Sequence, residues 1–149
     1  MAVTITLYNQ TVKRLVNQEV TLAGIYAMLL NDTAIFDATD VDLQDVSGVA
    51  DANQVSGFGW ADGGELLANV AITAVTTNDA KLDADDITKT ATGGSIGPAY
   101  KAVLYDTVDT PANGIPIAFI DFDGVREAGD TTDFVMRWHT NGIFTFTYT

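Results

Sequence analysis

The sequence predicts a mainly β protein, either a β-sandwich or an open β-barrel, with one short N-terminal helix and long loops. Short apolar or alternating stretches recur along the chain, separated by turn-favouring Gly, Asp, Asn and Pro residues. Helical periodicity is confined to one short stretch, and no repeat of about 20–50 residues is found. The 149 residues are expected to form one β-rich domain, residues 1–149. A domain of this size builds a core without disulfides, and the chain has no cysteine.

Two strands are predicted near the N-terminus. Val3, Ile5 and Leu7 alternate with polar residues, which is the period of a half-buried strand. Residues 25–30 are nearly all apolar, as expected for a strand that is covered on both faces. The first of these strands opens the domain, and the second belongs to its interior.

A helix of one or two turns is predicted between these strands, over residues 11–16. Val12, Leu15 and Val16 fall on one helical face, and Lys13 and Arg14 fall on the other. This pattern is typical of a short amphipathic helix whose apolar side faces the core.

Residues 33–54 are polar, acidic and without regular periodicity, so a long loop is expected there. Loops of this length in a compact domain are commonly functional or mobile. Val41, Leu43 and Val46 are its apolar residues and indicate a short helix or an anchored loop. The segment is a candidate contact element.

Residues 55–66 contain four glycines and the aromatic residues Phe58 and Trp60. Glycine is favoured where the backbone needs positive φ or approaches another chain segment closely, and a neighbouring aromatic ring can cover the backbone. We expect a tight crossing, anchored by Trp60, that leads from the acidic loop into a strand over residues 66–75. The crossing begins like a dinucleotide-binding fingerprint, but Asp62 stands where the third glycine belongs, so no phosphate site is predicted.

The second half of the chain is expected to alternate between turns and strands. Residues 99–105 alternate and precede an apolar stretch over residues 115–122, so an antiparallel pair joined by a loop at residues 109–114 is predicted. Turn or loop regions are expected at residues 79–86, 93–98 and 121–130, and a short apolar run begins at Ile87.

A final hairpin is predicted around Asn141 and Gly142. A two-residue turn would mix polar and apolar residues on both faces. A three-residue loop over residues 140–142 instead gives one wholly apolar face. We therefore favour the three-residue loop, which pairs Trp138 with Phe144, Met136 with Phe146 and Phe134 with Tyr148.

Charge and hydropathy exclude two classes of partner. Seven Lys and Arg residues against twenty Asp and Glu residues give a formal net charge of −13, so a phosphate backbone would be repelled. The longest apolar run, residues 23–30, is far shorter than the roughly 20 residues that span a bilayer. We predict no nucleic-acid partner and no membrane partner.

No motif predicts catalysis, a cofactor or a metal. Residues 93–97 match the nucleophile elbow of serine hydrolases, with Ser95 as nucleophile and His139 as the one histidine available as base. The elbow needs a strand before it and a helix after it, whereas Pro98 and a strand pattern follow here. Asp83, Asp85 and Asp86 lack calcium-loop spacing, so a solvated turn is favoured over a weak calcium site.

Taken in order, several blocks of the chain resemble small structural proteins encoded among the virion genes of tailed bacteriophages. Each block is a weak pattern, and the resemblance depends on their order and spacing over nearly the whole chain. The blocks are residues 8–15, 28–31, 45–46, 55–60, 63–66, 102–106, 120–122, 134–138 and 141–144.

The resemblance implies a non-enzymatic head decoration or cement protein, which binds the outer surface of the capsid and stabilises the shell. It implies the major capsid protein as partner, with a second copy of the chain as another candidate, and a location in the host cytoplasm during assembly and on the virion afterwards. The alternatives are a structural protein of the tail or head–tail junction and, from another class, a small serine hydrolase. The residues expected at the interface are Val3, Tyr8, Val41, Leu43, Val46, Phe58 and Trp60.

Overall fold

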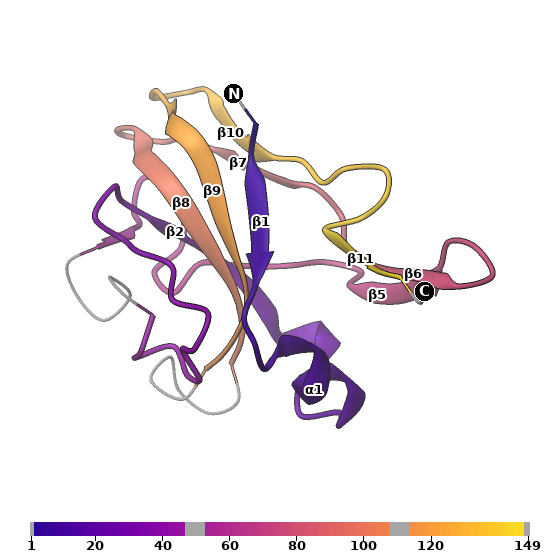
Figure 1. Cartoon of the computed structure of the whole chain (residues 1–149). Helices are drawn as coiled ribbons and strands as arrows, with labels where there is room; N and C mark the ends of the chain where they lie inside the picture. Colours follow the sequence, from indigo (N-terminus) through magenta and orange to yellow (C-terminus); the bar gives the residue numbers. More distant parts are fainter. Residues whose placement is uncertain (1, 47–52, 108–113, 148–149) are drawn as a thin grey trace.

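The computed structural model describes residues 2–46, 53–107 and 114–147 (Figure 1). The fold is mainly β and sandwich-like with one short α-helix, as predicted, and its sheets do not close into a barrel. The elements are β1 (Thr4–Leu7), α1 (Thr11–Val16), a 3₁₀ turn (Leu22–Gly24), β2 (Ile25–Leu30), β3 (Gln54–Val55), β4 (Glu65–Leu66), β5 (Ala71–Ala74), β6 (Asp79–Asp83), β7 (Ile87–Thr90), β8 (Ile96–Asp106), β9 (Ile115–Ala128), β10 (Asp133–Met136) and β11 (Phe144–Thr147).

The described residues form three antiparallel sheets. The main sheet has the order β1-β9-β8-β2-β3, and β4 also pairs with β2. The second sheet, called the ribbon, consists of β10 and β7. The third sheet, called the distal sheet, has the order β11-β6-β5. Figure 1 shows the distal sheet projecting to the right of the main sheet, and the ribbon lies near the upper end of the main sheet.

The main sheet is buried on both faces because its strands alternate between two apolar clusters. Ala27 and Leu29 of β2 lie in the larger cluster, which the ribbon and the base of the distal sheet help to cover. Met28 and Leu30 lie in the second cluster on the opposite face. The nearly continuous apolar sequence of β2 follows from this double burial, which confirms that prediction.

The predicted loop over residues 33–54 covers the second cluster along its described part. Leu43 and Val46 are fully buried there, and the Phe36 ring lies 5.1 Å from the Tyr8 ring between centroids. The Lys101 ammonium donates hydrogen bonds to the Asp32 and Ala34 carbonyl oxygens at 2.8 and 2.5 Å. This segment is therefore a covering layer held to the sheet, with Ile35 and Val41 left exposed on its outer side.

The glycine-rich crossing is tight, as predicted. The Gly57 and Trp60 backbones bond reciprocally around a two-residue turn. Gly59 and Gly64 have φ of +116° and +96°, and a Cβ on Gly64 would collide with the Ala27 carbonyl of β2. The Phe58 ring lies against the Gly94 backbone, where a side chain would not fit. The crossing thus depends on close backbone approach.

The predicted strand over residues 66–75 is wrong in one respect, because it divides into β4 and β5. Asn69 adopts a left-handed backbone with φ of +54°, and its side chain donates a 2.6 Å hydrogen bond to Asp85. Asparagine tolerates this conformation, so it ends one strand and redirects the chain to another sheet.

Three predicted turn regions are also wrong in whole or in part. Residues 79–83 form β6, whose Leu82 is fully buried between partly exposed Lys81 and Asp83. β9 continues through Ala128, with Phe122 and Ala128 buried while the intervening odd-numbered residues are exposed. β8 begins at Ile96, before the Gly97-Pro98 pair. In β6 and β9 the alternation of the sequence was obscured by charged residues, whereas β8 begins with a register shift between Ile96 and Ala99.

The short helix has the predicted bounds, but its predicted apolar face is wrong. Val12 and Val16 are exposed at 46% and 74%, whereas Thr11 is buried and its hydroxyl donates a 2.6 Å hydrogen bond to the Ile117 carbonyl oxygen. Leu15 alone of the three apolar residues packs against the core. One polar contact to β9 therefore sets the orientation of this helix.

The predicted final hairpin does not form. β10 pairs with β7 and β11 pairs with β6, so the two strands belong to different sheets. The turn closes by a 2.7 Å hydrogen bond from the Gly142 N–H to the His139 carbonyl oxygen. The predicted partner Tyr148 lies outside the described residues, as do most of the predicted loop at 109–114 and residues 47–52 of the acidic loop.

Candidate functional site

A groove of about 520 Å³ opens into the apolar interior on the β1 side of the sandwich. Ile120 and Phe122 of β9 form part of its lining, together with Phe134 and Met136 of β10. Val3 and Val135 also line the groove, and their side chains are exposed at 51% and 40%. The site is therefore mostly apolar, with apolar groups available to a partner.

The groove is open because two strands that line it have an unpaired edge in the described part of the chain. β1 is the last strand of the main sheet and pairs only with β9. Among the described strands, β10 pairs only with β7. A free edge exposes backbone N–H and C=O groups that can pair with another extended chain. The groove thus combines an apolar surface with a backbone template.

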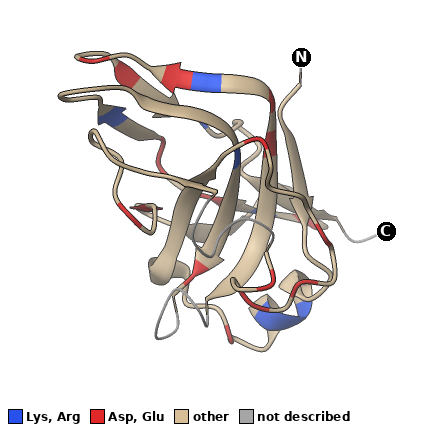
Figure 2. Cartoon of the chain, turned by 90° about the vertical axis from the view of Figure 1, so that its left-hand side faces the viewer, with Lys and Arg blue, Asp and Glu red and all other residues tan. Residues whose placement is uncertain are grey.

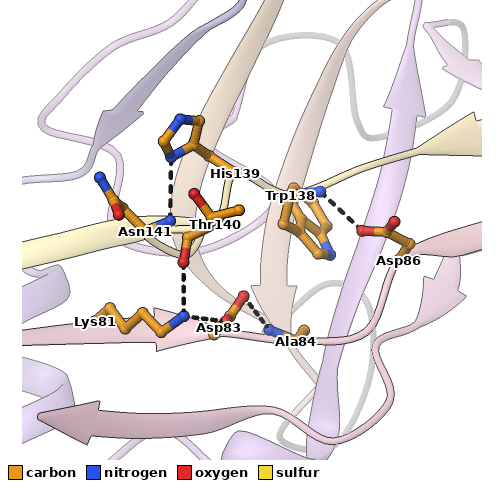
Figure 3. A network of polar contacts seen from close by, with 8 residues as sticks. All are labelled: Lys81, Asp83, Ala84, Asp86, Trp138, His139, Thr140 and Asn141. Atoms are coloured by element: carbon orange, nitrogen blue, oxygen red, sulfur yellow. Dashed lines mark hydrogen bonds and ion pairs between the residues drawn. The ribbon is translucent and has the colours of Figure 1, made fainter. Parts of the chain in front are cut away.

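One wall of the groove is the segment 137–143, which polar contacts hold in place (Figure 3). The Trp138 backbone N–H donates to the Asp86 carboxylate at 3.0 Å, and its indole N–H donates to the Asp85 carbonyl oxygen at 3.0 Å. The Lys81 ammonium donates to the Thr140 carbonyl oxygen at 2.9 Å and also contacts Asp83 at 2.6 Å. This wall is therefore pre-formed, which lowers the ordering cost of binding.

Positive and negative side chains are balanced around the groove. Arg126 and Arg137 line it together with Glu127 and Asp133. His139 also lines it. The Arg126 guanidinium donates to the Phe122 carbonyl oxygen at 2.8 Å. This balance contrasts with the whole chain, where twenty acidic residues face seven basic ones, and Figure 2 shows acidic residues on many loops and strand ends.

Four of the seven predicted interface residues are wrong, because they are buried. Tyr8, Leu43, Val46 and Trp60 are each at most 2% exposed and belong to the two apolar clusters. A large apolar residue in a polar segment looks like a contact residue in the sequence. In the fold, these residues anchor their segments to the sheets.

The other three predicted interface residues are exposed but do not form one site. Val3 lines the groove, whereas Val41 lies on the covering layer and Phe58 at the tip of the crossing. Val135, Arg126 and Arg137 were missed as groove residues. The incorrect hairpin assigned Val135 to a strand paired with the C-terminal strand, and the incorrect turn hid the strand that carries Arg126.

The hydrolase elements are not assembled in the described part of the chain. Ser95 precedes β8 rather than a helix. The His139 Nδ1 atom accepts a 3.1 Å hydrogen bond from the Asn141 N–H, and no hydrogen bond joins it to Ser95. The strand-to-helix turn that exposes a nucleophile is therefore missing.

The carboxylates considered for calcium have separate partners. Asp83 contacts Lys81, Asp85 accepts from Asn69, and Asp86 accepts from Trp138. Across the described ranges, no group of three or more His, Cys, Asp or Glu side chains has the arrangement of a metal site.

One buried carboxylate belongs to the covering layer itself. Asp40 is 8% exposed, and burial, reinforced by Asp37, Asp45 and Asp42, raises the pKa of its carboxyl group to about 6. The pKa of the Tyr8 phenol is also raised, chiefly by burial and further by the Asp40 charge. A charged Asp40 is thus disfavoured in the folded state.

Comparisons with protein-family models, curated proteins and solved structures found no match to this chain. In the described part of the chain, no helix combines the length and the apolar character needed to cross a membrane. The functional argument therefore rests on the groove, on the residues that surround it and on the resemblance of the sequence blocks.

Proposed function

We propose that this chain is a non-enzymatic structural protein of a tailed-bacteriophage virion. It binds the outer surface of the head as a decoration or cement protein and stabilises the shell. The partner is the major capsid protein, and the contact is made through the groove and the adjoining edge of β1.

The observation that carries the proposal is the open groove beside an unpaired strand. Val3 is exposed in it and Val135 is exposed on the bordering strand β10, and exposed apolar groups next to a free strand edge favour protein binding. The resemblance of the ordered sequence blocks to virion proteins supplies the class of partner. The net charge of −13 favours a protein surface over DNA.

Repetition on the shell makes a modest contact sufficient. A capsid presents the same binding surface many times, so each copy reinforces its own part of the shell. The pre-formed wall at residues 137–143 reduces the ordering that each contact requires.

The proposal is tested by sedimenting purified chain with DNA-free heads prepared without it. The wild-type chain is expected to co-sediment with the heads. Val3→Asp and Val135→Asp should each weaken binding by about tenfold or more, equivalent to about 1.4 kcal/mol, because each introduces a charge into an apolar contact.

Val12→Asp is the matched control. The exposed fraction of Val12, 46%, is similar to the exposed fractions of Val3 and Val135. Val12 lies on α1, at the opposite end of the molecule from the N-terminus and β10 (Figure 1). An acidic residue is also favourable near a helix N-terminus. Failure of the wild-type chain to bind heads, or equal binding by all three variants, would contradict the proposal. Binding to tails alone would place the chain there.

A further inference from the structure

The distal sheet ends in a second unpaired strand, β5, which lies away from the groove. β5 pairs with β6 from Ala71 to Ala74 without interruption, and no other described strand pairs with it. The sheet projects from the rest of the molecule in Figure 1, so the outer edge of β5 is open to approach.

This edge lacks the features that usually prevent strand pairing between chains. Natural edge strands are commonly protected by charged residues, proline or bulges. No Asp, Glu, Lys, Arg or Pro occurs over residues 66–78, and the pairing of β5 with β6 contains no bulge. Ile72 and Val75 are exposed at 44% and 45%.

The distal sheet also has one apolar and one polar face. Residues directly opposite each other on neighbouring strands point to the same side of the sheet and form a cross-strand row. Two such rows make up the apolar face. On the polar face, Thr73, Lys81 and Thr145 form a row. The apolar rows are Ile72-Leu82-Phe144 and Ala74-Ala80-Phe146.

The apolar face continues outward from the core. Leu82 at its base is fully buried, whereas Ile72 at its edge is 44% exposed. A shallow hollow of about 480 Å³ is lined in part by Ala74, Ala80 and Phe146. The outer part of this apolar face is thus left uncovered by the described residues.

We propose that β5 pairs antiparallel with β5 of a second copy of this chain, forming a two-fold dimer with a continuous six-stranded sheet. A register that places Ile72 opposite Ala74 of the second copy keeps both apolar faces on the same side. The apolar rows of the two copies then lie side by side across the dimer axis, and each copy covers part of the exposed β5 edge of the other.

The distribution of charge favours a second copy as the occupant. Two copies that each carry a net charge of −13 repel one another wherever acidic surfaces meet. The uncharged β5 avoids like charges in the strand contact, and nearby Lys81 is paired with Asp83. A basic partner would be attracted to the acidic surfaces instead. The proposed head binding is not required for this dimer.

A weak, concentration-dependent dimer is expected. Stable interfaces typically bury about 800 Å² on each partner, more than a four-residue strand edge provides. Sedimentation velocity over a roughly hundredfold range of concentration should show dimer increasing by mass action. Amide exchange at Ile72 and Ala74 should slow as dimer forms.

Two variants test the contact by different means. Ile72→Lys places like charges in the contact. Ala74→Pro removes a backbone N–H that points away from β6, since the adjacent Val75 N–H donates to the Asp79 carbonyl oxygen. Each should raise the dimer dissociation constant by about tenfold or more, equivalent to about 1.4 kcal/mol.

Val16→Lys is the control, because Val16 is exposed at the end of α1, where a cation is tolerated. It should dimerise like the wild-type chain. The proposal is overturned if the wild-type chain stays monomeric throughout, or if its dimer forms without slower exchange at Ile72 and Ala74. If either variant fails to fold, this exchange measurement on the wild-type chain decides the result.

Discussion

Trp60 attaches the glycine-rich crossing to the core. Its ring packs edge-on against Phe134 of β10 at 5.3 Å between centroids, and the residue is 2% exposed. Trp60→Ala should therefore lower the free energy of unfolding by about 3–5 kcal/mol through lost burial and a residual cavity. Urea denaturation measures the loss. Phe58→Ala, at a residue 52% exposed, should cost clearly less. Equal small losses would show that Trp60 is not an anchor.

Asp40 makes stability depend on pH in a defined direction. Its pKa is about 6 in the folded protein and near 3.8 when unperturbed, so the folded state binds the extra proton between these values. This contribution makes the protein more stable as pH falls from 7 towards 4.

Asp40→Asn removes this penalty and should raise the melting temperature at pH 7 by about a few degrees. Its advantage over the wild-type chain should shrink towards about pH 4, where Asp40 is protonated in the folded state and partly protonated in the unfolded state. Thermal melts of both proteins at the two pH values measure this difference in melting temperature. Its dependence on pH distinguishes the contribution of Asp40 from a general effect of net charge. An advantage independent of pH would contradict the assignment.

At the scale of elements, close backbone approach at Gly64 joins the crossing to β2. Gly64 and Gly57 have similar φ, +96° and +99°, but a Cβ on Gly57 would meet no neighbour. Both alanine variants incur left-handed strain of about 1–2 kcal/mol, and Gly64→Ala should cost about 1–3 kcal/mol more through collision with Ala27. Urea denaturation of the pair isolates this term. Equal losses would rule it out.

The sequence predicted the elements whose patterns are local. β1, β2 and the bounds of α1 follow from alternation, continuous apolarity and a short helical period. β6 was missed because Asp79, Lys81 and Asp83 dominate the composition of a strand in which Leu82 is fully buried. The final hairpin failed because pairing was assigned between neighbours, whereas β10 and β11 pair with strands far earlier in the chain.

At the scale of the whole molecule, the groove is a product of topology. Its residues come from both ends of the chain and meet only because β1 pairs with β9 while β10 pairs with β7. Val3 was predicted because it is apolar on an opening strand. Arg126 and Val135 carry no local signal of this kind. The buried anchors Leu43 and Trp60 could not be distinguished from contact residues before the covering layer and the crossing were placed.

The proposed head decoration is tested most directly by cryo-electron microscopy of tailed-phage virions assembled in the presence of this chain. The account predicts density that fits the sandwich at symmetry-related positions on the outer surface of the head, with the groove facing the shell. Heads without this density, or density for the chain only in the tail or at the head–tail junction, would contradict it.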